Sequence, residues 1–180
     1  MTQAGTVLDS DIQIVFVLYG DIVSIPEIVD RIKKKGKLAM VHADLISGLA
    51  GKEIAIDFLK RNTQADGIIS TKLSFIKRAK ELGMATVFRF FVIDSMAFDN
   101  IQKQYEAACP DFVEILPGIM PKIIAKVAKM VSAPVIAGGL IAEKADIYAA
   151  IRGRSHFHLI HKSEYLVYRN ERGKTDGSRL

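Results

Sequence analysis

Side chains of the kinds that bind or transform small molecules follow short apolar runs in this sequence. His42 and Asp44 are spaced as H-x-D after the run 38–41. Residues two apart on an extended chain point to the same side, so both are predicted to face one site. Three roles stay open for the pair: binding ligand hydroxyls, a structural hydrogen-bonded pair, or metal binding or acid–base catalysis. Two such ligands are too few to define a metal centre, so neither a metal nor a cofactor is expected.

An arginine inside an apolar run marks a second candidate site. Arg89 lies between Phe88 and Phe90. A buried arginine needs an anionic partner. That partner is either Glu114, from the following apolar run, or the phosphate of a bound ligand, and the sequence leaves both open.

Two consecutive glycines end the stretch APVIAGGLI, residues 133–141. Glycine costs chain entropy, so Gly138 and Gly139 indicate that something approaches the bare backbone closely. One interpretation is a phosphate received by backbone N–H groups after a strand. The other is a tight turn into a helix that begins at Glu143.

The apolar runs alternate with amphipathic segments along the whole chain. Strands are predicted at Ile12–Leu18, Leu38–His42, Gly67–Ser70, Thr86–Phe91, Phe112–Leu116, Val135–Ala137 and His156–His161. Helices are predicted at Pro26–Lys35, Lys52–Arg61, Ser74–Leu82 (capped by Ser74), Met96–Cys109, Pro121–Met130 and Glu143–Ile151. This alternation predicts an α/β fold with a parallel sheet, specifically a TIM-like β/α barrel that lacks one strand–helix unit at its N-terminus. Candidate polar residues lie where these strands end, at the mouth of such a barrel.

Composition excludes several classes of protein. The chain has 180 residues, 49% of them apolar, and no apolar run is long enough to cross a bilayer. With one cysteine and no signal-like N-terminus it is expected to be cytoplasmic, without a membrane partner. The expected organisation is one domain, residues 1–168, and a basic, flexible tail, residues 169–180. Four of the five net positive charges lie within residues 152–180.

Four strings together resemble the glycerol-uptake operon antiterminator regulatory protein family: MVHADLISGL, ADGIISTK, DFVEILPGIMPKII and PVIAGGLI, within residues 12–150. The resemblance implies a β/α-barrel-type fold. It also implies a regulator that responds to glycerol 3-phosphate and acts on the leader of glycerol-utilisation messenger RNA to prevent premature termination. The ligand contacts predicted at the barrel mouth are His42, Asp44, Ser70, Thr71, Arg89, Glu114, Pro117, Gly118, Gly138, Gly139 and Ser163.

The last predicted strand departs from the family pattern. Family members carry a strand rich in alanine and glycine that ends in hydroxyl residues, whereas this chain reads RGRSHFHLIHKSEYL. Ser163 is the one equivalent hydroxyl, and His161 and Lys162 are the alternative donors. The RNA is predicted to contact a basic cluster, and a homo-oligomer is possible. The members of that cluster are Arg31, Lys33, Lys34, Lys35 and Lys37.

An enzyme is the alternative function. A β/α barrel that isomerises or cleaves a small phosphorylated substrate would use His42, Asp44 and Glu114 for acid–base work. Lys72 is the nearest candidate for a Schiff-base lysine, but no nucleophile–base pair is evident. The regulator, without catalytic residues, is therefore the favoured interpretation.

Overall fold

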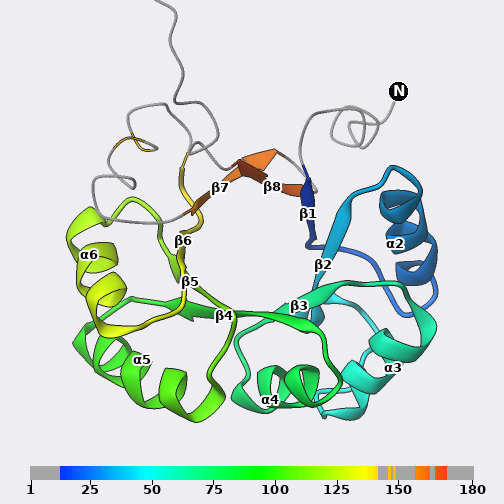
Figure 1. Ribbon diagram of the computed structural model, residues 1–180, viewed down its shortest axis with the longest axis horizontal. Coiled ribbons are helices and arrows are strands. Elements are labelled where there is room, and N and C mark those ends of the chain that lie inside the picture. The colour runs from blue at the N-terminus through cyan, green and yellow to red at the C-terminus, as the bar shows by residue number, and fades with distance from the viewer. Residues whose placement is uncertain (1–12, 142–145, 147, 149–156, 163–164, 170–180) are drawn as a thin grey trace, which may run out of the picture.

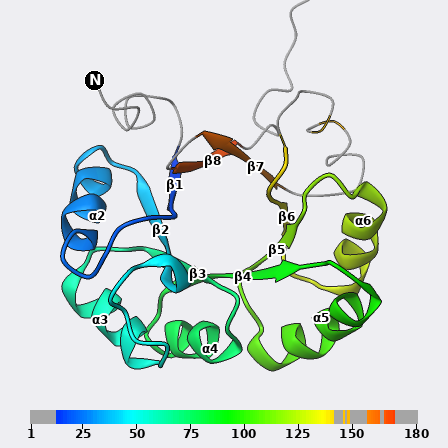
Figure 2. The same ribbon diagram turned by 180° about the vertical axis from the view of Figure 1, so that it is seen from behind.

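The fold is a curled parallel sheet with helices on its outer side. The computed structural model describes residues 13–141, positions 146 and 148, and residues 157–162 and 165–169. Six parallel strands form a half-barrel consistent with part of a TIM-like barrel, and the helices line its convex face (Figures 1 and 2). The predicted α/β class and barrel-like curvature are confirmed at this level.

Each predicted strand of the half-barrel is present within two residues of its expected bounds. The strands are β1 (Ile14–Val17), β2 (Leu38–His42), β3 (Gly67–Ser70), β4 (Ala85–Phe91), β5 (Phe112–Leu116) and β6 (Val135–Ala137). Consecutive strands pair in parallel, which is possible because a helix returns the chain between them.

The helices follow the predicted positions with one correction at a cap. They are α2 (Ile25–Lys34), the short 3-10 helix η1 (Ala43–Leu45), α3 (Ile54–Asn62), α4 (Leu73–Glu81), α5 (Ser95–Ala108) and α6 (Pro121–Met130). Ser74 is not the cap of α4, because the helix begins one residue earlier and Lys72 holds the cap position. Asp94 caps α5 and accepts a 2.7 Å hydrogen bond from the Ala97 N–H. The helix predicted at Glu143–Ile151 lies largely outside the described residues.

The last two described strands pair antiparallel with each other, unlike the strands of the half-barrel. Strand β7 (Phe157–Lys162) pairs in parallel with β6, close to the predicted His156–His161. Strand β8 (Tyr165–Arg169), which was not predicted, runs antiparallel to both β7 and β1. Two residues separate β7 from β8, and a connection that short joins antiparallel strands, whereas a parallel crossover needs a dozen or more residues.

The two faces of the curled sheet carry different kinds of side chain. Outward-facing residues such as Val41, Phe88 and Ile115 pack against the helices in the main core. A second, smaller apolar cluster lies on the inner face and consists of Phe16, Met40, Ile69, Val87 and Ile136. Because strand side chains alternate with period two, the next inward positions of β2, β4 and β5 are His42, Arg89 and Glu114. The inner face is therefore apolar toward the strands' amino ends and polar toward their carboxyl ends.

Candidate functional site

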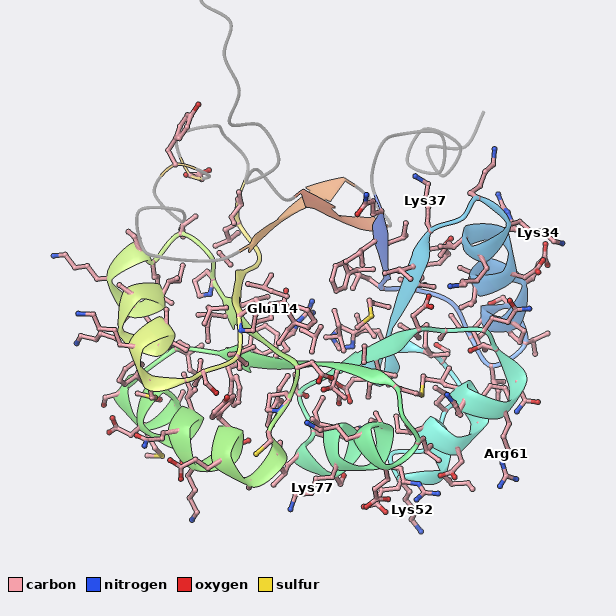
Figure 3. All side chains as sticks on the ribbon, viewed as in Figure 1. Lys34, Lys37, Lys52, Arg61, Lys77 and Glu114 are labelled. Atoms are coloured by element: carbon pink, nitrogen blue, oxygen red, sulfur yellow. The ribbon has the colours of Figure 1, made fainter. Side chains whose placement is uncertain are left out.

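Arg89 and Glu114 form a buried ion pair at the carboxyl end of the sheet. They are register partners on β4 and β5. The Arg89 Nε donates to Glu114 Oε2 at 2.6 Å, and its Nη2 donates to Oε1 at 3.2 Å. Arg89 is 7% exposed and Glu114 is fully buried. Figure 3 shows Glu114 on the inner side of the strands. Of the two partners considered for Arg89, the structure shows the carboxylate.

Burial dominates the electrostatics of this pair. Removing Glu114 from water raises its pKa above the usual range, and the Arg89 charge opposes that shift. A carboxylate in such a place depends on its guanidinium partner to remain ionised. The pair is thus a fixed, buried and doubly hydrogen-bonded feature beneath the mouth of the half-barrel.

The ion pair explains the first of the two glycines. A Cβ atom at Gly138 would lie 2.2 Å from Glu114 Oε1, far inside van der Waals contact. The Gly138 N–H donates to the Ile115 carbonyl at 3.0 Å, so this N–H serves the sheet. Gly139 has φ +71°, a conformation that L side chains rarely adopt. The close approach expected from the sequence is present, and the group that approaches Gly138 is the Glu114 carboxylate.

The carboxyl end of β3 and the residues after it bring Ser70, Thr71 and Lys72 to Asp44, which lies in η1 after β2. The Asp44 carboxylate accepts hydrogen bonds from Ser70 Oγ at 3.0 Å and from the Thr71 N–H at 2.8 Å. Thr71 Oγ1 lies 3.3 Å away, and the Lys72 ammonium lies 3.4 Å from Asp44 Oδ1. Ser70 Oγ also accepts from the Lys72 N–H at the start of α4. The sequence singled out Asp44, Ser70 and Thr71 as ligand contacts, and Lys72 as the nearest candidate for a Schiff-base lysine.

His42 lies beside this cluster and is 3% exposed. Its Nδ1 is the one buried side-chain nitrogen or oxygen among the described residues that has no hydrogen-bond partner. The nearest acidic oxygen is Asp44 Oδ2 at 3.9 Å, beyond hydrogen-bonding distance. Burial, and secondarily the Arg89 charge, lower the pKa of His42 to about 4, against the opposing charge of Asp44. The imidazole is therefore neutral near neutral pH.

This lowered pKa makes stability depend on pH. His42 has a pKa of about 4 in the folded protein and about 6.5 in the unfolded chain, so the unfolded chain binds more protons between these values. The contribution of His42 is complete above about pH 6.5 and is lost as the pH falls toward 4. We expect this residue to account for about 2 kcal/mol of lost unfolding free energy between about pH 7 and about pH 5.

Urea denaturation of the wild-type protein and of His42→Asn at both pH values measures this contribution. The two proteins differ in no titratable group other than His42, so the difference between their pH dependences reports on His42. Equal slopes with pH would contradict a buried neutral imidazole.

The remaining predicted site residues are distributed as follows. Pro117, which follows a cis peptide bond, and Gly118 form the loop after β5, and the Gly118 N–H donates to the Gly139 carbonyl at 3.0 Å. This contact joins the loops after β5 and β6. Ser163 lies outside the described residues. Within the part of the chain described, no three His, Cys, Asp or Glu side chains are grouped as metal ligands.

The basic cluster predicted to contact RNA is partly neutralised. Lys33 pairs with Asp66 at 2.7 Å, and Lys34 pairs with Asp30 at 2.6 Å. Lys37 is buried, at 6% exposure. Figure 3 shows Lys34 on the outer side of α2, and other basic side chains, such as Arg61 and Lys77, on α3 and α4. Basic side chains on the outer surface are therefore not confined to the predicted cluster.

Among the described residues, no helix is long and apolar enough to cross a membrane.

Comparison with known proteins identifies close relatives. A crystal structure of the glycerol uptake operon antiterminator regulatory protein of Listeria monocytogenes is 34% identical, with a TM-score of 0.81 over 84% of this chain and 82% of that one. A glycerol uptake operon antiterminator-related protein of Thermotoga maritima is 33% identical, with a TM-score of 0.74 over 85% and 86% of the two chains. The uncharacterized protein YgcP of Escherichia coli is 47% identical over 144 residues, which cover 80% of this chain and 75% of YgcP.

A family model confirms the resemblance seen in the sequence motifs. It matches residues 1–157, a wider span than the 12–150 that carry the motifs, and ends at the first residue of β7. Residues 158–180, which include the rest of the strand that departs from the family pattern, lie beyond the match. The chain belongs to the glycerol-3-phosphate responsive antiterminator family.

Proposed function

We propose that this protein regulates transcription antitermination of glycerol-utilisation genes, binding glycerol 3-phosphate at the carboxyl mouth of the half-barrel and leader messenger RNA on another surface. Two relatives named for the glycerol uptake operon antiterminator support the regulatory role, since each aligns over more than four fifths of its own length. The family description supports glycerol 3-phosphate as the signal. In this proposal the protein is not an enzyme.

The observation that carries the ligand site is the unpartnered Nδ1 of His42. Buried polar atoms are almost always hydrogen-bonded, and an exception in a folded protein calls for a functional or structural explanation. His42 lies next to Asp44, Ser70 and Thr71, which come from the carboxyl ends of neighbouring parallel strands, where β/α barrels bind ligands. A polyol phosphate offers both hydroxyl groups and an anion to such a set.

The side chains that an enzyme would use for acid–base or Schiff-base chemistry already interact with partners in this structure. Glu114 is fully buried against Arg89, and Asp44 accepts from three donors. Lys72 lies 3.4 Å from Asp44 Oδ1 and 4.5 Å from the centre of the Phe75 ring. Acid–base catalysis or Schiff-base formation would need these groups to be released from their partners, so the regulator remains the function that the geometry supports best.

Regulation requires that the ligand prefer one state of the protein. Glycerol 3-phosphate must bind the RNA-competent state more tightly than the other state, because a ligand with equal affinity for both shifts nothing. The RNA itself is expected to bind a basic surface. Arg31, Lys34 and Lys35, the exposed members of the predicted cluster, are the proposed contacts together with the positive charge of residues 152–180.

Thermal denaturation with added glycerol 3-phosphate tests the ligand. A ligand that binds only the folded protein raises Tm, by an amount that corresponds to about 2.7 kcal/mol at a hundredfold excess over Kd. We expect a rise with glycerol 3-phosphate that exceeds any rise with glycerol or inorganic phosphate at equal concentration. Consumption of glycerol 3-phosphate during the experiment would favour the enzyme, and an unchanged Tm in the folded protein would contradict the proposed ligand.

A further inference from the structure

The Asp44 carboxylate occupies an arrangement of donors suited to an anion. These donors are the Thr71 N–H, just before α4, the hydroxyls of Ser70 and Thr71, and the Lys72 ammonium. Backbone N–H groups at a helix N-terminus, combined with hydroxyls and a cation, bind phosphate groups in many proteins. Here the occupant is a side chain of the protein, carried by η1 after β2.

Asp44 is close to only two of these four donors and lies farther from the other two. Its contacts to the Thr71 N–H and Ser70 Oγ, at 2.8 and 3.0 Å, are ordinary hydrogen bonds. The Thr71 Oγ1 contact, at 3.3 Å, exceeds the about 2.5–2.7 Å of a charge-assisted O–H···O bond, and the Lys72 Nζ contact, at 3.4 Å, exceeds the about 2.7–2.9 Å of a charge-assisted N–H···O bond. A phosphate monoester carries three acceptor oxygens and nearly two negative charges, against two oxygens and one charge for a carboxylate. It therefore matches four donors better than Asp44 does.

His42 provides a second place for the same carboxylate. Its orphan Nδ1 is buried and lies 3.9 Å from Asp44 Oδ2. A movement of about 1 Å brings the two atoms within hydrogen-bonding distance. An Asp44 displaced from Ser70 and Thr71 would thus gain a partner, and the one unpartnered buried side-chain atom of the described residues would be satisfied.

We propose that Asp44 is an internal competitor for the anion site formed by Ser70, Thr71 and Lys72, and that the phosphate of a small phosphate monoester displaces it toward His42. The inference deepens the proposed function and rests on it in one respect, the identification of that monoester as glycerol 3-phosphate. The displacement moves the loop between β2 and α3. That loop also borders Lys72, because a Cβ atom at Gly51 would lie 3.8 Å from the Lys72 Nζ. Ligand binding is in this way coupled to a surface loop.

Removing the competitor tests the proposal. Asp44→Asn keeps the shape of the side chain and loses its charge, so inorganic phosphate, titrated by calorimetry, should bind this variant at least about tenfold more tightly than the wild-type protein. Adding Lys72→Met to Asp44→Asn should abolish the gain. Unchanged or weaker phosphate binding by folded Asp44→Asn would overturn the proposal, since it would mean that Asp44 assists the ligand.

A measurement on the wild-type protein decides the matter if Asp44→Asn fails to fold. The ¹⁵N resonances of His42, assigned by comparison with His42→Asn, should shift when glycerol 3-phosphate or inorganic phosphate is added and stay unchanged with glycerol. Unmoved resonances at saturating phosphate or glycerol 3-phosphate would overturn the displacement.

These outcomes separate this inference from the proposed function. Tighter phosphate binding by Asp44→Asn supports the anion site even if glycerol 3-phosphate does not alter RNA affinity, in which case the proposed function alone fails. An RNA response to glycerol 3-phosphate without any gain in Asp44→Asn, and with unmoved His42 resonances, leaves the regulator intact and contradicts the competitor.

Discussion

Replacing Glu114 by glutamine is expected to lower the free energy of unfolding by about 3–5 kcal/mol. Glutamine keeps the size and one acceptor oxygen but leaves the Arg89 charge, which is 7% exposed, without a counterion. Breaking a buried ion pair on one side costs more than the pair itself contributes, because the remaining charge stays desolvated. Urea denaturation near pH 7 measures the loss.

Two variants serve as controls for this result. Lys34→Met removes an exposed i, i+4 pair with Asp30 and is expected to leave the unfolding midpoint unchanged. The double substitution Arg89→Met with Glu114→Leu removes both charges and should recover most of the stability that Glu114→Gln loses. A loss below about 1 kcal/mol for Glu114→Gln would contradict a desolvated ion pair.

Gly138→Ala is the second large effect and is expected to cost at least about 2 kcal/mol. The added methyl group would lie 2.2 Å from Glu114 Oε1. Glu114 has little room to retreat, because it is fully buried and its two oxygens receive the Arg89 N–H groups. The substitution therefore has two effects. It overpacks the site, and it strains the ion pair between Arg89 and Glu114. Thermal and urea denaturation without ligand measure the cost.

Gly51→Ala is the matched control for Gly138→Ala. A Cβ at Gly51 meets only the flexible end of Lys72, at 3.8 Å, so no destabilisation is expected. In a Glu114→Ala background, Gly138→Ala should cost less than in the wild-type protein, since the obstructing carboxylate is absent. Additive costs in this cycle would contradict the clash with Glu114. Normal stability of Gly138→Ala together with loss of phosphate binding would instead favour the phosphate contact predicted from the sequence.

Most of the fold was predictable because its signals are local. Each strand of the half-barrel is a short apolar run, and Pro26 and Pro121 mark helix starts. Strand β8 was missed because Tyr165–Arg169 is adjacent to a predicted tail, and its partner β1 lies at the other end of the chain. The pairing with β1 is long-range and leaves no local trace, whereas the pairing with β7 is a local hairpin across a two-residue connection that was not predicted from the sequence.

The sequence predicts which residues form the candidate site better than it predicts the contacts among them. The ends of β2, β3, β4 and β5 supplied His42, Asp44, Ser70, Arg89 and Glu114, because strand ends gather at one edge of a parallel sheet. That Glu114 fills the space beside Gly138 depends on how the curled strands face one another, which the sequence does not encode locally. The pairing of Lys72 with Asp44 likewise arises from two loops 28 positions apart in the sequence.

The affinity of the purified protein for a glycerol-utilisation leader RNA, with and without glycerol 3-phosphate, tests the central claim most directly. Gel-shift titrations at one fixed salt concentration are required, because phosphate-backbone contacts weaken steeply with salt. The proposal predicts at least about tenfold tighter RNA binding with glycerol 3-phosphate than with glycerol or inorganic phosphate, a coupling of about 1.4 kcal/mol. Equal RNA affinity with and without glycerol 3-phosphate, in a protein shown to bind it, would contradict a ligand-controlled antiterminator.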